Sequence, residues 1–97
     1  MKNAFLPTHV HYPDSKDFKD AIQVANSNRY EAIYFDPKNL DNDKVFMLFE
    51  TPNDFRILRT EYDSCLDRFH SSENDTLHVF ETRSSAFRYL QKITKVQ

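Results

Sequence analysis

The sequence predicts an α+β fold in which a mostly antiparallel sheet of four to five strands packs with two to three helices, in the approximate order β-α-β-β-β-α-β-α. Two observations support this prediction. Short apolar segments are bounded by turn residues, and longer segments repeat apolar residues at helical spacing. The length of 97 residues fits one domain, so we expect a single compact α+β domain over residues 1–97.

The segment 44–59 predicts a hairpin at the centre of this sheet. Five consecutive apolar residues at 45–49 indicate a strand with apolar side chains on both faces, which favours a central or covered position. Residues 51–54 (Thr-Pro-Asn-Asp) have turn chemistry. Because two or three short helices are barely enough to cover both faces, we expect one set to lie uncovered. This set is either Phe46 and Leu48 or the three apolar residues that alternate with them.

A strand and a helix are predicted before this hairpin. Residues 4–12 have β propensity, and Pro7 within them indicates an edge strand or a bulge. Asp14 suits a helix N-cap. Apolar residues then follow at i, i+3, i+4 and i+7, which predicts an amphipathic helix: Phe18, Ala21, Ile22 and Ala25. Asn-Ser-Asn at 26–28 ends the helix, since asparagine tolerates the left-handed conformation where glycine is lacking.

Residues 31–36 predict the second strand. If it lay parallel to the first strand in one sheet, the helical crossover between them would be right-handed. Residues 36–43 form a turn-rich loop, which we expect to be the most mobile element. A last strand is predicted over 76–81, followed by a helix that Thr82 caps. The apolar face of that helix consists of Ala86, Phe87, Leu90 and Ile93.

Residues 61–70 predict a short helix, because Thr60 and Asp63 have capping-box spacing and an apolar stripe follows. The alternative is that the second hairpin strand continues past Arg59. Cys65 lies on the apolar stripe, where cysteine behaves as a small buried apolar residue. We therefore favour a structural Cys65 over a nucleophile paired with histidine.

The chain contains no glycine, which excludes several functional motifs. A phosphate-binding P-loop, a G-x-G-x-x-G dinucleotide turn, a G-x-S-x-G nucleophile elbow and a standard EF-hand loop all require glycine. The single cysteine excludes an internal disulfide and fits a reducing compartment. No apolar segment approaches the roughly 20 residues of a membrane-spanning helix. We expect a cytoplasmic protein without a membrane partner.

Two histidines, His9 and His11, lie two residues apart and share one face of the first predicted strand. Two imidazoles can share a metal ion if a third ligand converges, and His78, His70 or a carboxylate is a candidate. Chance pairs of this kind also occur on half-exposed strands. We therefore predict no bound metal or cofactor and keep a metal-binding domain or small enzyme that uses the His9/His11 pair as an alternative.

The charge distribution is uneven. Residues 36–81 carry eleven acidic and five basic side chains, whereas residues 82–97 carry four basic and no acidic ones. RNA binding by a sheet with exposed tyrosines is a second alternative, and it would use four arginines: Arg56, Arg59, Arg83 and Arg88. The acidic middle opposes phosphate, so nucleic acid is not the favoured partner. Paired acids such as Asp41/Asp43 and Asp63/Asp67 are expected to be solvated rather than catalytic.

The favoured function is a non-enzymatic protein-interaction module. The sequence lacks a catalytic or cofactor motif, and it carries nine phenylalanines and five tyrosines, the latter common at interfaces. We expect an aromatic and apolar sheet face to bind a protein partner or a second copy, as in a small inhibitor, antitoxin or adaptor, with carriage on a mobile element as a hypothesis. The predicted partner-binding residues are Tyr12, Tyr34, Phe46, Leu48, Arg56, Tyr62 and Tyr89.

Overall fold

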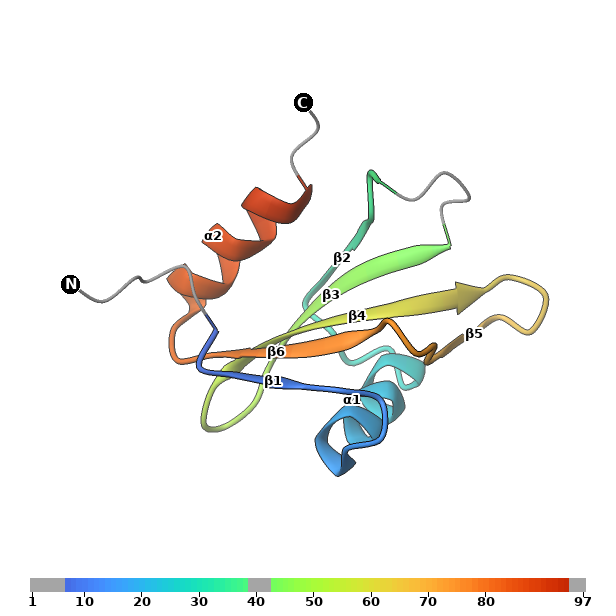
Figure 1. Cartoon of the computed structure of the whole chain (residues 1–97), viewed down its shortest axis with the longest axis horizontal. Coiled ribbons are helices and arrows are strands. Elements are labelled where there is room, and N and C mark those ends of the chain that lie inside the picture. Colours follow the sequence, from blue (N-terminus) through green and yellow to red (C-terminus); the bar gives the residue numbers. More distant parts are fainter. Residues whose placement is uncertain (1–6, 39–42, 95–97) are drawn as a thin grey trace.

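The hairpin of β3 (Lys44–Glu50) and β4 (Phe55–Asp63) forms the centre of a six-stranded antiparallel sheet, with one helix on each face (Figure 1). The structure is a computed structural model and describes residues 7–38 and 43–94. The strand order is β1-β6-β4-β3-β2, and β5 pairs with the far end of β4. The other elements are β1 (His9–His11), α1 (Lys16–Asn26), β2 (Ala32–Phe35), β5 (Arg68–His70), β6 (Thr76–Phe80) and α2 (Arg83–Thr94). The predicted α+β fold is confirmed.

The turn of the hairpin lies at the predicted residues. Glu50 pairs with Phe55 at the end of the ladder, and the Thr51 N–H donates to the Asp54 carbonyl at 2.9 Å. The Thr51 hydroxyl oxygen accepts from the Asp54 N–H at 3.1 Å and donates to the Asp54 carboxylate at 2.6 Å. Arg56 binds the same carboxylate at 2.9 Å. Burial raises the pKa of Asp54, but the hydrogen bonds from Arg56 and Thr51 outweigh it, so the net pKa is lowered.

Helix α1 covers the face of the sheet that contains Val45 and Met47. Its cap is Ser15, one residue after the predicted Asp14, and the Ser15 hydroxyl accepts from the Phe18 N–H at 3.1 Å. The predicted stripe is confirmed, since three of its residues are buried and the fourth packs beside them. Asn28 follows the helix in the left-handed region at φ 59°. Asparagine therefore takes the place that glycine usually occupies after a helix.

Helix α2 covers the opposite face, which contains Phe46 and Leu48. The Thr82 hydroxyl accepts from the Ser85 N–H at 3.1 Å, which confirms the predicted cap. Phe46 is 7% exposed and Leu48 is 0% exposed. Both belong to an apolar cluster that also contains Ala86 and Leu90 of α2. The expectation that one face of the hairpin lies uncovered is therefore wrong. Because one helix covers each face, both sets of β3 side chains are core.

The predicted helix over 61–70 is absent, and the alternative of a longer β4 is correct. Strand β4 runs to Asp63, and the chain turns and returns as β5, with Tyr62 paired to Phe69. The Asp63 carboxylate caps the turn by accepting from the Cys65 N–H at 2.9 Å, and Asp67 takes the left-handed conformation at φ 51°. Cys65 is exposed in this turn rather than buried on a helix.

Strands β1 and β2 occupy opposite edges of the sheet, and α1 connects them across one face (Figure 1). They are not neighbours, so the conditional parallel pairing does not occur. Of the first predicted strand, residues 9–11 form β1, and residues 4–6 lie outside the described part of the chain. The predicted mobility of the 36–43 loop concerns residues 39–42, which also lie outside it.

Candidate functional site: the β2 edge and its aromatic pocket

Strand β2 exposes apolar side chains on both faces. Ile33 is 39% exposed, Tyr34 40% and Phe35 61%. Helix α1 packs mainly on β4, β5 and β6, and α2 packs mainly on β4 and β6, whereas β2 packs chiefly on β3. Cross-strand pairing places Ile33 and Phe35 on the α1 face, opposite Met47 and Val45, and Tyr34 on the α2 face. An edge strand of this composition favours pairing with another chain.

The outer backbone groups of β2 belong to Ile33 and Phe35. The Asp36 N–H donates to the Lys44 carbonyl at 2.9 Å, so this position faces β3. Because residues of an antiparallel strand alternate between facing the partner strand and facing away, Ala32 and Tyr34 also face β3. The N–H and C=O groups of Ile33 and Phe35 therefore point away from the sheet. No strand among the described residues pairs with this side of β2.

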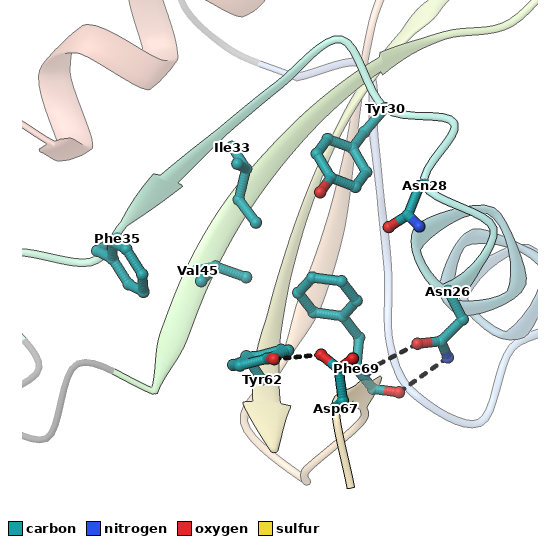
Figure 2. A pocket seen from close by; sticks show the side chains of 9 residues that line it. All are labelled: Asn26, Asn28, Tyr30, Ile33, Phe35, Val45, Tyr62, Asp67 and Phe69. Atoms are coloured by element: carbon teal, nitrogen blue, oxygen red, sulfur yellow. Dashed lines mark hydrogen bonds between the residues drawn. The ribbon is translucent and has the colours of Figure 1, made fainter. Parts of the chain in front are cut away.

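A pocket of about 330 Å³ opens beside β2 on the α1 face (Figure 2). Phe69 is its buried aromatic component, with the Tyr62 ring centroid at 5.3 Å and the Tyr30 ring edge-on at 6.3 Å. Ile33 and Phe35 come from the edge strand itself. The pocket is lined by Asn26, Asn28, Tyr30, Ile33, Phe35, Val45, Tyr62, Asp67 and Phe69. An apolar or aromatic side chain suits such a lining.

Polar groups fix the walls of the pocket. The Asn26 amide donates to the Phe69 carbonyl at 3.0 Å and accepts from the Phe69 N–H at 2.7 Å, which joins the end of α1 to β5. The Tyr62 hydroxyl donates to the Asp67 carboxylate, and this hydrogen bond raises the pKa of Tyr62. In Figure 2 the Tyr30 hydroxyl points into the pocket. Within the pocket lining, Asp67 is the one carboxylate, and its contact to Tyr62 holds the ring in place.

The seven predicted partner-binding residues do not form one surface. Tyr34 lies on the β2 edge and Tyr62 lines the pocket, whereas Tyr12, 58% exposed, follows β1 at the opposite edge. Tyr89 packs on the Phe80 ring at 5.2 Å, and burial raises its pKa. The remaining predicted residues are the core residues Phe46 and Leu48, and Arg56, whose guanidinium binds Asp54.

A buried charged cluster lies at the open end of the β3–β4 hairpin, away from the turn at 51–54. The Lys44 ammonium contacts the Asp75 carboxylate at 2.8 Å, the Glu61 carboxylate at 3.2 Å and the Ser72 hydroxyl at 2.6 Å. Asp75 is fully buried and also accepts from the Ser72 N–H at 2.8 Å. Arg59 lies between Asp75 at 3.5 Å and Asp36 at 3.3 Å. Each charged group of this cluster thus contacts an opposite charge, which is typical of a structural ion-pair network.

The histidines do not converge on one site. The His9 and His11 rings stack at 6.3 Å, which confirms their shared face, and His11 lies 3.2 Å from Asp17. His78 pairs with Val10 between them and therefore lies on the opposite face, where burial lowers its pKa. Residues 7–38 and 43–94 contain no group of three or more potential ligands that could hold a metal ion.

The arginines proposed for RNA binding are engaged within the molecule. Arg56 binds Asp54, Arg59 binds Asp36, and Arg83 on α2 binds Glu31 at 2.8 Å. Arg88 is exposed on α2. Ion pairing of Arg56, Arg59 and Arg83 with carboxylates of the same chain reduces their attraction for phosphate.

The pocket residues Tyr30, Ile33, Phe35 and Phe69 were not among the predicted site residues. Phe69 and Tyr62 come together only because β4 and β5 form a ladder. The helix predicted over 61–70 excluded that ladder. Consecutive apolar residues at 32–35 were a usable signal. The position of that strand at an edge, however, depends on the strand order.

No protein-family model matches the chain, and neither a curated protein nor a solved structure shows significant similarity to it. Among the described residues, neither helix has the length and apolar character needed to cross a membrane. The functional interpretation therefore rests on the geometry of the β2 edge and its pocket.

Proposed function

We propose that this protein is a non-enzymatic protein-interaction module that binds by adding an extended segment of a partner protein to the β2 edge. The observation that carries the proposal is the exposure of Ile33, Tyr34 and Phe35 on a strand whose outer backbone groups point away from the sheet. Added strands gain affinity from backbone hydrogen bonds and specificity from pockets for alternate side chains. The pocket beside Ile33 and Phe35 supplies such a site for one apolar side chain.

The proposal accounts for both faces of the strand. A partner segment would place every second side chain on the α1 face, against the pocket, and the others on the α2 face beside Tyr34. A module of this kind suits an inhibitor, antitoxin or adaptor, since each acts by occupying a surface of another protein. The proposal includes a cytoplasmic location, because an exposed single cysteine is compatible with a reducing compartment.

Selection of displayed random peptides tests the proposal for a partner of any sequence. Wild-type protein serves as bait, and the affinity of each selected peptide is then measured for wild type and for the Phe35→Lys variant. Selected peptides should carry alternating apolar residues and should bind the Phe35→Lys variant at least about tenfold more weakly, a change of about 1.4 kcal/mol.

The matched control is Tyr12→Lys, which changes a similarly exposed aromatic residue at the opposite edge. It should leave the affinity of selected peptides unchanged. Peptides that bind wild type and Phe35→Lys equally well, or that lose affinity on Tyr12→Lys instead, would show that the binding surface lies elsewhere.

A further inference from the structure

We propose that the occupant of the β2 edge is a second copy of this chain, paired antiparallel about a two-fold axis centred on Tyr34. This inference rests on the proposed function of the β2 edge and names its partner. It follows from three properties of the strand: its outward backbone groups, the side chains that they would bring together and the charges at its ends.

The backbone groups of β2 are self-complementary in one register. The outward N–H and C=O groups belong to Ile33 and Phe35. If Ile33 of each copy lies opposite Phe35 of the other, each pair exchanges two hydrogen bonds, and the two pairs make four in total. Tyr34 then lies opposite Tyr34 at the two-fold axis, in the closer, non-hydrogen-bonded type of pair.

The neighbouring registers lose hydrogen bonds. A shift that pairs Phe35 with Glu31 of the second copy needs the Glu31 N–H, but this group already donates to the Leu48 carbonyl at 2.8 Å. A shift the other way pairs Ile33 with Pro37, which has no N–H. The register centred on Tyr34 is therefore the one in which the outward C=O groups of both Ile33 and Phe35 receive an N–H donor.

The side chains also match in this register. Ile33 of one copy lies beside Phe35 of the other on the α1 face, at the mouth of each pocket. The two Tyr34 rings meet on the α2 face, where each is 40% exposed. Aromatic and β-branched cross-strand pairs are among those that stabilise antiparallel sheets.

Charge favours this edge for self-pairing. Each copy has a net charge of −2, so an uncharged contact surface avoids adding local repulsion between like charges. Residues 32–35 are uncharged, and the acidic residues at their ends are neutralised within the chain, Glu31 by Arg83 at 2.8 Å and Asp36 by Arg59 at 3.3 Å.

A four-residue strand buries little area, and interfaces well below the standard size are weak. Sedimentation equilibrium should therefore cover concentrations from about 10 μM to 1 mM. Wild-type protein should shift from monomer to dimer in this range. Because each substitution places two like charges face to face at the axis, Tyr34→Lys and Tyr34→Glu should each weaken the dimer at least about tenfold.

An equimolar mixture of the Tyr34→Lys and Tyr34→Glu variants is the sharpest part of the test. It should recover dimer, because opposite charges then meet at the axis. Circular dichroism verifies that each variant is folded, and Tyr12→Lys should dimerise like wild type. A wild type that stays monomeric up to 1 mM, or a mixture that recovers no dimer, overturns the self-pairing.

The two proposals fail differently. If the wild type is monomeric but displayed peptides still bind at the β2 edge, self-pairing is wrong and the interaction module stands. If peptides selected on the protein bind equally well to Phe35→Lys, the capture of a partner segment at the β2 edge is wrong, whereas self-pairing is still decided by the Tyr34 variants.

Discussion

Alanine substitutions of Phe46 and Phe35 test the assignment of Phe46 to the core and of Phe35 to the exposed β2 edge. Both residues are phenylalanines on neighbouring strands, but Phe46 is 7% exposed beneath α2 and Phe35 is 61% exposed at the edge. Phe46→Ala removes a ring from the core and leaves a cavity, for which losses of about 3–5 kcal/mol are usual. The Arg59 guanidinium, 6.0 Å from the Phe46 ring centroid, loses its aromatic contact as well.

For Phe35→Ala the expected loss is much smaller. Only about two fifths of the side chain is buried, so the transfer free energy of roughly 1.5–3 kcal/mol scales to about 0.6–1.2 kcal/mol. A domain of this size has a total stability of about 5–15 kcal/mol. Phe46→Ala should therefore remove a large fraction of the stability, whereas Phe35→Ala should leave the domain folded at 25 °C.

Urea denaturation followed by far-ultraviolet circular dichroism measures both effects. A loss of about 3 kcal/mol lowers the urea midpoint by about 1–3 M for ordinary slopes. The same midpoint for both variants would refute the assignment of Phe46 to the core and Phe35 to the surface. A larger loss for Phe35→Ala would place β2 in a buried environment and remove the basis of the proposed site.

Three further predictions concern features away from the β2 edge. Lys44→Met should cost about 3–5 kcal/mol in urea denaturation, because it leaves the buried Asp75 carboxylate without its ammonium, whereas Lys16→Met, in an exposed pair, should leave the urea midpoint nearly unchanged. Burial lowers the pKa of His78 below its ordinary 6.5, so the unfolded state binds the proton more readily and stability is lost as the pH falls. The His78→Gln variant should therefore lose less stability than wild type between pH 7 and pH 5. Asn28→Gly should leave the melting temperature nearly unchanged, whereas Asn28→Val should cost about 1–2 kcal/mol at this left-handed position; equal effects of the two substitutions would contradict this account.

Local patterns predicted the elements that local physics determines. The apolar stripe of α1, the Thr82 cap of α2 and the turn at 51–54 all follow from interactions within a few residues, and all are confirmed. The helix expected over 61–70 is the instructive failure. Tyr62 and Phe69 are seven residues apart, which fits one face of a helix, but they also face each other across the β4–β5 ladder. Pairing with β4 decided between these structures, and the sequence pattern alone could not.

The candidate site depended on information that is not local. The sequence indicated that 31–36 is a strand, and Tyr34 was among the predicted binding residues. Only the strand order reveals that this strand lies at an edge and that Ile33 and Phe35 are exposed there. The same order places β3 inside the sheet, where α1 and α2 cover its two faces, so both sets of its apolar side chains are core.

Amide hydrogen exchange at Ile33 and Phe35 tests the central claim most directly. In the dilute protein these two amides should exchange rapidly, because they point away from the sheet, whereas the Ala32 and Tyr34 amides should be protected by β3. On binding of a selected peptide, or at concentrations where the protein self-associates, exchange at Ile33 and Phe35 should slow by at least about tenfold. Binding that leaves both amides in rapid exchange, or that protects Val10 of β1 instead, would contradict the assignment of the β2 edge as the interaction surface.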